Sequence, residues 1–148
     1  MLEMRGLQAS YGLSQVLFDV SMSIGEGEVV TLLGRNGMGK STTVKSIMGI
    51  LQPKNGSIEF DGRQISGVSS FNIARAGIGL VPEGRHIFPN LTVRENLIAT
   101  ARQDSGNPSP WEYERVLELF PRLKERIGNF GDQLSGGEQQ MLAIGRAL

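Results

Sequence analysis

A short glycine-rich segment constrains the fold of this chain more than any other feature. Before it stands an apolar run, residues 29–33, bounded by glycines, which is typical of a strand buried on both faces. After it, apolar residues recur at the spacing of one helix face: Val44, Ile47, Met48 and Leu51. We therefore predict a strand, a tight turn and a helix in direct succession. The segment itself is Gly34-Arg35-Asn36-Gly37-Met38-Gly39-Lys40-Ser41.

This segment matches the G-x-x-x-x-G-K-S/T pattern of a phosphate-binding P-loop, in the strand-to-helix context that the pattern requires. Its glycines let successive backbone N–H groups surround an anion, and the helix N-terminus adds partial positive charge. Lys40 would reach the β- and γ-phosphates, the Ser41 hydroxyl would ligate Mg²⁺, and Thr42 would add a phosphate contact. The plain alternative is a glycine turn that binds nothing. The pattern leaves GTPases, kinases and many ATPases open.

The composition excludes several kinds of site. The chain of 148 residues has no Cys and a single His, which excludes disulfides and cysteine metal sites and argues against a His-centred triad. Fifteen Lys and Arg balance fifteen Asp and Glu, which argues against a basic surface for nucleic acid. No apolar stretch approaches the ~18 residues that cross a bilayer. We expect a soluble, cytoplasmic chain with no nucleic-acid partner.

Further strands are predicted in the first half. One half-buried strand is indicated by apolar residues that alternate with polar ones: Phe18, Val20, Met22 and Ile24. Asp61-Gly62 separates two short runs as in a two-residue hairpin. A second buried strand is expected at residues 78–81, where Pro82 ends it.

The second half is predicted to be mostly helical. Two capping boxes mark helix starts: Thr92 with Glu95, and Ser135 with Glu138. Ser109 and Pro110 supply another N-cap and a proline in the first turn, with Glu112 as capping partner. The helix that follows Ser135 shows no stop signal before Leu148. We therefore expect the sequence to be a C-terminally truncated piece of a longer domain.

The second of these boxes lies inside a motif that resembles the signature of ATP-binding-cassette (ABC) proteins: Leu134-Ser135-Gly136-Gly137-Glu138-Gln139. From the residues alone, it is a serine N-cap beside two glycines, and a helix start of this kind can also bind an anion. An ordinary capping box is compatible with the same residues. With the P-loop, the motif makes essentially the whole chain resemble an ABC transporter nucleotide-binding domain.

This resemblance implies an α/β fold, namely a P-loop NTPase cassette with a RecA-like core, an antiparallel β subdomain and a helical subdomain, incomplete at its C-terminus. Residues 1–89 would form the β subdomain and P-loop core, residues 90–133 the helical subdomain, and residues 134–148 the signature and the start of the following helix. ATP and Mg²⁺ are the implied cofactors. Two ATP molecules would be sandwiched between the P-loop of one protomer and the signature of its partner.

The resemblance also assigns residues to roles. The implied ATP contacts are Tyr11, which would stack on adenine, and Gly34, Arg35, Asn36, Gly37, Met38, Gly39, Lys40, Ser41 and Thr42. The implied contacts to the partner's ATP are Leu134, Ser135, Gly136, Gly137, Glu138 and Gln139. Lys40 and Glu83 are the catalytic candidates, and Ser41 and Glu83 the metal ligands. The family usually has Gln where Glu83 stands, and a core role for Tyr11 is the alternative to stacking.

The run Pro82-Glu83-Gly84-Arg85 resembles the ATP-binding subunits of branched-chain amino-acid importers. The implied function is the ATP-hydrolysing, energy-coupling subunit of an importer for branched-chain or other hydrophobic amino acids. Its partners would be a second ATPase subunit, identical or different, transmembrane permease subunits and, indirectly, a periplasmic or extracellular substrate-binding protein. It would lie peripherally on the cytoplasmic face of the cell membrane.

Three alternatives stay open: a urea or amide importer ATPase, a soluble ABC switch protein, and a non-catalytic nucleotide-binding fragment. The last arises because the family's Walker B Asp, catalytic Glu and switch His do not occur in these residues. We expect the intact protein to hydrolyse ATP and this piece not to.

Overall fold

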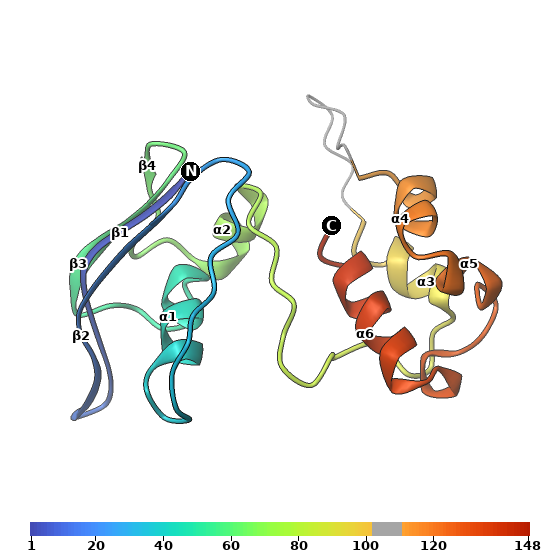
Figure 1. The fold of residues 1–148 in the computed structure, drawn as a ribbon, viewed down its shortest axis with the longest axis horizontal. Helices are drawn as coiled ribbons and strands as arrows, with labels where there is room; N and C mark the ends of the chain where they lie inside the picture. Colours follow the sequence, from blue (N-terminus) through green and yellow to red (C-terminus); the bar gives the residue numbers. More distant parts are fainter. Residues whose placement is uncertain (102–110) are drawn as a thin grey trace. The chain divides into compact units, whose positions relative to one another are not determined.

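The computed structural model describes residues 1–101 and 111–148, which divide into two compact units, Met1–Ile78 and Gly79–Leu148. Each unit has its own secondary structure and its own buried apolar residues, so each is described by itself (Figure 1). Among the described residues, no helix is long and apolar enough to cross a membrane. The expectation that Ser109 and Pro110 begin a helix lies outside the described residues.

The first unit is built on an antiparallel sheet. Its strands are β1 (Leu2–Tyr11), β2 (Ser14–Ile24), β3 (Asn55–Phe60) and β4 (Arg63–Gln64), in the order β2-β1-β3-β4. The predicted Asp61-Gly62 hairpin is confirmed, since Phe60 pairs with Arg63 across the turn and both turn residues have positive φ. The sheet contributes most of this unit's core through Met4, Leu7, Ala9, Leu17 and Ile58.

A β-bulge changes which residues of β2 face the core. Leu7 pairs with Val20, whereas Ala9 pairs with Leu17, so β2 carries one extra residue at Phe18 and Asp19. Asp19 takes a positive φ of 58° there. The bulge reverses the alternation, so Leu17 is buried and Phe18 is 67% exposed. The predicted alternation is therefore wrong at Phe18, because a regular period cannot anticipate an inserted residue.

Two helices, α1 (Lys40–Ile47) and α2 (Ser70–Arg75), lie on one side of this sheet (Figure 1). The helix predicted after the glycine-rich segment is confirmed, and its predicted apolar face is buried in part. Met48 is buried, Ile47 and Leu51 are half-buried, and Val44 is exposed. Helix α1 also buries Thr42, Thr43 and Ser46, which the apolar spacing did not predict.

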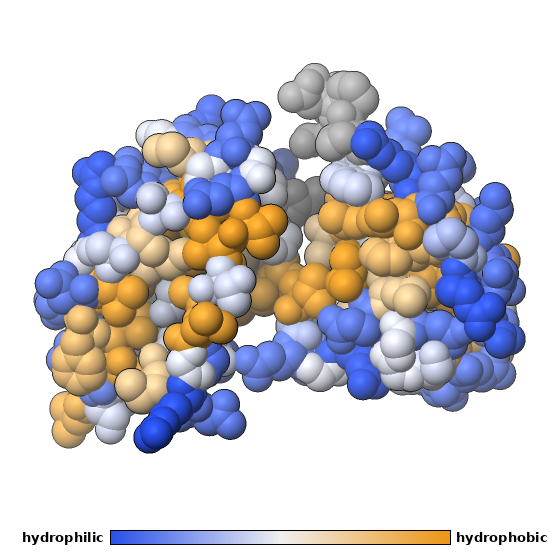
Figure 2. Space-filling view, in the orientation of Figure 1, coloured by the Kyte–Doolittle hydropathy of each residue, from blue (hydrophilic) through white to orange (hydrophobic). Residues whose placement is uncertain are grey.

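The two strands predicted as buried do not form. Residues 29–33 and 78–81 have no strand structure, and Val29 and Leu33 are 92% and 88% exposed. A strand of this kind needs hydrogen-bonding neighbours and cover on both faces. Within the described residues, the β2-β1-β3-β4 sheet provides neither for these segments. Figure 2 shows that apolar surface, in orange, remains on each unit.

The second unit is helical. It contains α3 (Val93–Ile98), α4 (Tyr113–Leu119), α5 (Pro121–Glu125), the 3-10 helix η1 (Gly131–Gln133) and α6 (Gly136–Gly145). The capping boxes at Thr92 and Ser135 are both confirmed. Helix α4 begins at Tyr113 and Glu112 is its N-cap without a side-chain cap hydrogen bond, so the capping role predicted for Glu112 inside the first turn is wrong. The core of this unit consists of Val93, Leu97, Val116, Leu117, Leu123, Leu134 and Leu142.

Candidate nucleotide-binding site

The glycine-rich segment leads directly into α1, which begins at Lys40. Gly37 and Gly39 have φ values of 83° and 87°, the left-handed conformation that turns a backbone sharply at little cost only for glycine. The Met38 N–H donates to the Arg35 carbonyl at 3.3 Å, which closes the turn. The geometry is therefore that of a tight loop at a helix N-terminus, which favours an anion.

The loop rests on the bulged part of β2. A Cβ built at Gly39 would lie 2.7 Å from Leu17 Cδ2 and 3.6 Å from the Val16 carbonyl oxygen. Leu17 itself is buried, so it has little room to move. The bulge and the absence of a side chain at Gly39 together allow the loop to approach the sheet this closely.

The Lys40 ammonium is held inside the loop. Its Nζ donates to the carbonyl oxygens of Gly34 at 2.7 Å and Arg35 at 2.9 Å. An ammonium has three donors and a flexible stem, so it can exchange such neutral acceptors for phosphate oxygens. Behind it, the buried Thr43 hydroxyl donates to the Gly39 carbonyl at 3.0 Å and ties the helix to the loop.

The other predicted contacts of the P-loop differ in exposure. The Ser41 residue is exposed at the start of α1, whereas Thr42 beside it is only 6% exposed. A hydroxyl at a helix start is accessible to a phosphate-bound cation, which fits the role predicted for Ser41. The contact predicted for Thr42 stays a prediction, although its burial makes it the less accessible of the two.

Tyr11 lies at the end of β1 and is 47% exposed. The Lys45 ammonium of α1 lies 6.0 Å from the centroid of its ring, at the limit of a cation–π contact. An exposed ring next to the P-loop helix is compatible with stacking on a base. Lys45 was not identified from the sequence, because only the fold brings α1 beside the end of β1.

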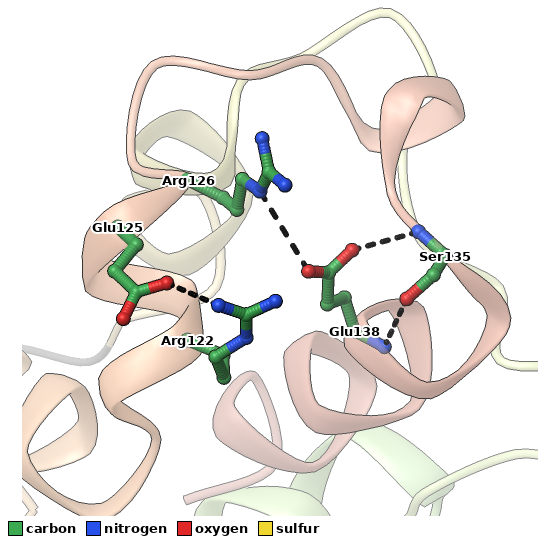
Figure 3. A network of polar contacts seen from close by, with 5 residues as sticks. All are labelled: Arg122, Glu125, Arg126, Ser135 and Glu138. Atoms are coloured by element: carbon green, nitrogen blue, oxygen red, sulfur yellow. Dashed lines mark hydrogen bonds and ion pairs between the residues drawn. The ribbon is translucent and has the colours of Figure 1, made fainter.

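In the second unit, the signature residues form the N-terminus of α6. The Ser135 N–H donates to Glu138 Oε2 at 2.8 Å, and the Glu138 N–H donates to Ser135 Oγ at 3.3 Å (Figure 3). Hydrogen bonds that the Glu138 carboxylate accepts from the backbone N–H and the side chain of Ser135, and then the nearby Arg126 and Arg122, lower the pKa of Glu138 below its ordinary value of 4.5. Figure 3 shows Arg126 reaching Glu138, with 3.7 Å between Nε and Oε1. Glu138 is thus ionised near neutral pH, where it stabilises the helix start.

The remaining signature residues divide into buried and exposed ones. Leu134 is buried in the core of the second unit, while Gly136 and Gly137 are exposed at the first turn of α6. Gln139 Nε2 donates to the Gly131 carbonyl at 3.1 Å, which links α6 to η1. A buried leucine anchors the motif, and the exposed glycines leave the backbone at the helix start accessible.

Glu83 lies in a turn that precedes the helices of the second unit. The Arg85 N–H donates to the Pro82 carbonyl at 3.3 Å, and Gly84, Arg85 and His86 all have positive φ. This turn is attached to α6 by hydrogen bonds from Arg85 to Gln139 and from Arg146 to the His86 carbonyl. No pattern in the sequence predicted these contacts, because the two segments lie far apart along the chain.

The family model described as ABC transporter matches residues 17–148. The chain belongs to the ABC transporter family. The predicted membership is therefore confirmed.

Curated ABC relatives differ in what they transport. The high-affinity branched-chain amino acid transport ATP-binding protein BraG of Pseudomonas aeruginosa is 47% identical over 148 residues, which is 100% of this chain and 64% of that protein. The lipopolysaccharide export system ATP-binding protein LptB of Haemophilus influenzae is 38% identical over 144 residues, 96% of this chain and 60% of that protein. The chain therefore spans less than two thirds of the length of either relative.

A solved ABC cassette has the same fold. The dimeric structure of a post-hydrolysis state of the cassette MJ0796, bound to ADP and Pi, matches with a TM-score of 0.79 and 28% identity. The match covers 100% of this chain and 69% of that one. It confirms the predicted α/β cassette fold, and it shows that a relative binds nucleotide as a dimer.

The structure groups the predicted cassette residues within its two units. Tyr11 and the P-loop belong to the first unit, and Glu83 and the signature to the second. Across the described residues, no cluster of three His, Cys, Asp or Glu side chains could hold a metal ion. The shared metal role of Ser41 and Glu83 stays a prediction.

Proposed function

We propose that the native protein is the ATP-hydrolysing, energy-coupling subunit of an ABC importer for branched-chain or other hydrophobic amino acids. The observation that carries the proposal is the presence, in one ABC chain, of a P-loop that encloses Lys40 and a signature helix capped by Ser135. The amino-acid cargo is supported by the 47% identity to a branched-chain amino acid transport protein. The 38% identity to an export protein shows that cargo varies among relatives, so cargo needs its own test.

Each residue has a defined task in this proposal. Lys40 would leave its two carbonyl acceptors and neutralise the β- and γ-phosphates of ATP. Ser41 would hold Mg²⁺, which neutralises charge that develops on the phosphates during transfer. Tyr11 would stack on adenine, and Glu83 would contribute a carboxylate to the metal or to the attacking water. Ser135, Gly136 and Gly137 would contact the ATP held by the partner's P-loop.

The proposal includes partners and a location. The protomer would pair with a second ATPase subunit, and the pair would bind permease subunits on the cytoplasmic face of the membrane. A substrate-binding protein outside the membrane would deliver the amino acid. The Walker B Asp and catalytic Glu of the family are absent from residues 1–148, so this piece would bind ATP without turnover.

The test compares ATP hydrolysis by the purified native protein with that of a Lys40→Ala variant. We expect turnover to fall at least about 100-fold, since one charge-stabilising donor at a reacting phosphate contributes about that much. Lys124→Ala, which removes an exposed lysine of α5, is the matched control and should keep its activity. Equal turnover by the wild type and Lys40→Ala would contradict the ATPase proposal.

Cargo is tested separately, by uptake of radiolabelled leucine into cells that lack the gene and carry either the wild type or Lys40→Ala. Leucine uptake restored only by the wild type supports the amino-acid importer. If the purified protein hydrolyses ATP but the cells take up no leucine, isoleucine or valine, another cargo, such as urea or an amide, would be favoured.

A further inference from the structure

The turn after Glu83 has an unusual backbone. Three successive residues, Gly84, Arg85 and His86, have φ values of 80°, 69° and 49°. Only glycine adopts this region freely, so Arg85 and His86 are strained, and such strain persists only where surrounding contacts hold it. Strain of this kind concentrates at functional sites, so the contacts that hold this turn are informative.

Those contacts run to both ends of α6. At the helix start, Arg85 Nη1 donates to Gln139 Oε1 at 3.0 Å. At the helix end, Arg146 Nη1 donates to the His86 carbonyl at 2.7 Å, and its guanidinium lies 4.2 Å from the centroid of the Phe88 ring. Arg85 and Arg146 therefore connect the turn at residues 84–86 to helix α6 by hydrogen bonds.

Arg85 also covers the backbone of the signature itself. A Cβ built at Gly136 would lie 3.3 Å from Arg85 Nη2 and 3.4 Å from Nη1. The guanidinium thus lies in tight contact range of this position, and a side chain there would displace it by a few tenths of an ångström. The absence of a side chain at Gly136 therefore allows the Arg85 guanidinium to lie against the helix backbone.

The charge of Arg85 does not serve to stabilise α6. A helix N-terminus carries partial positive charge, so a cation beside its first turn is electrostatically unfavourable there. Glu138 already satisfies the cap and supplies the negative charge that this end prefers. If residue 85 served only to stabilise the fold, a neutral side chain would be electrostatically more favourable there than an arginine.

We propose that Arg85 is a positioning residue of the signature helix. Through Gln139 and Gly136 it makes the start of α6 move together with the Glu83 turn, so that Ser135 and the signature glycines are placed for the partner's ATP. The proposal rests on the proposed ATPase function and adds a residue to it. Its consequence is that Arg85 contributes to turnover and not to the binding of ATP by the protomer's own P-loop.

The experiment uses the native full-length protein with Arg85→Ala, Arg85→Lys and, as control, Arg63→Ala, which removes an exposed arginine of β4. We expect Arg85→Ala to lower kcat about tenfold while affinity for a fluorescent ATP analogue changes less than about twofold, because the lost interaction acts on the reacting complex. Arg85→Lys should recover part of kcat, since an ammonium can still donate to Gln139. Arg63→Ala should match the wild type.

Hydrogen exchange provides a readout that needs no activity. Amides at the start of α6 should exchange several-fold faster in Arg85→Ala than in the wild type, because the helix start loses its attachment to the turn. If the wild type shows no turnover, the ATPase proposal fails, while exchange still tests the role of Arg85. Should Arg85→Ala fail to fold, Arg85→Gln carries the same measurements.

Two results would overturn the proposal. One is exchange and kcat in Arg85→Ala that equal those of the Arg63→Ala control. The other is an equal loss of kcat and of nucleotide affinity together with a lowered Tm, since this would mean that Arg85 supports the fold alone.

Discussion

Single residues determine how closely the P-loop approaches the sheet beneath it. Gly39 faces the buried Leu17, and Lys40 reaches back to the carbonyls of Gly34 and Arg35. The missing side chain of Gly39 allows the loop to approach the sheet, and the two hydrogen bonds of the Lys40 ammonium hold the loop in its turn. The proposed binding of nucleotide by this loop would therefore depend on backbone shape as well as on the charge of Lys40.

The contact beneath the loop predicts unequal effects at two glycines with similar φ. Gly37→Ala meets no atom within 4 Å and should cost about 1 kcal/mol, from the positive φ alone. Gly39→Ala adds the clash with Leu17, so we expect about 1–3 kcal/mol more, together with weaker nucleotide binding. Guanidinium unfolding of the two variants measures the difference. Equal stability would mean that Leu17 yields and does not restrict the loop.

Among the helices, one buried side chain joins α3 to the segment before it. Asn96 is fully buried, and its Nδ2 donates to the carbonyls of Phe88, Leu91 and Thr92 at 2.9–3.1 Å. Its Oδ1 accepts from the Phe88 N–H at 2.9 Å. Asn96 thereby adds a second donor at each of these three carbonyls and supplies the acceptor for the Phe88 N–H.

Removal of this side chain should destabilise the second unit. Asn96→Ala leaves the Phe88 N–H without its acceptor and removes one of the two donors at each of the three carbonyls, so we expect a loss of about 1–3 kcal/mol in the free energy of unfolding. The control is Asn90→Ala, an exposed asparagine of the same segment, which should change stability by less than about 0.5 kcal/mol. Circular dichroism during guanidinium unfolding measures both. A small effect of Asn96→Ala would show that water replaces its hydrogen bonds.

The sequence predicts those elements whose determinants are local. The boxes at Thr92 and Ser135 need only a side chain and a backbone N–H three residues away, and both are found. The runs at 29–33 and 78–81 depend on pairing with distant strands, and neither forms here. The P-loop and signature are recognisable because they too are continuous in sequence.

The contacts that support the site were not predictable in the same way. Lys45 beside Tyr11 and Arg85 beside Gln139 come together only after the chain has folded. No spacing rule connects positions so far apart along the chain. The sequence therefore predicts the groups expected to contact ATP, but not the side chains that lie against them in the fold.

The surface of the whole molecule carries apolar side chains that cores usually bury. Val29 and Leu33 are almost fully exposed within one short segment, and Figure 2 shows other apolar areas. Such side chains gain about 1.5–3 kcal/mol each when a neighbouring surface covers them. Exposed apolar segments of this kind promote association.

We expect the chain of residues 1–148 to self-associate and a Val29→Thr, Leu33→Thr double variant to do so less. Sedimentation velocity over a range of concentrations measures the change. Leu13→Thr is the control, because Leu13 is fully exposed at the β1–β2 turn, outside this segment. Association that is unchanged in the double variant, or reduced equally by Leu13→Thr, would assign it to another surface.

Because Leu17 of the bulged strand β2 packs against Gly39, the P-loop depends on the number of residues in β2 as well as on their identity. A deletion within β2 that shifted Leu17 by one residue against β1 would turn Leu17 to the other face of the sheet and direct a different side chain toward Gly39. Every residue of the P-loop would be unchanged, yet its support would be altered. A one-codon deletion in this strand could thus impair nucleotide binding while leaving the motif itself intact. Variants of this gene are for that reason better judged by aligned strand register than by motif identity alone.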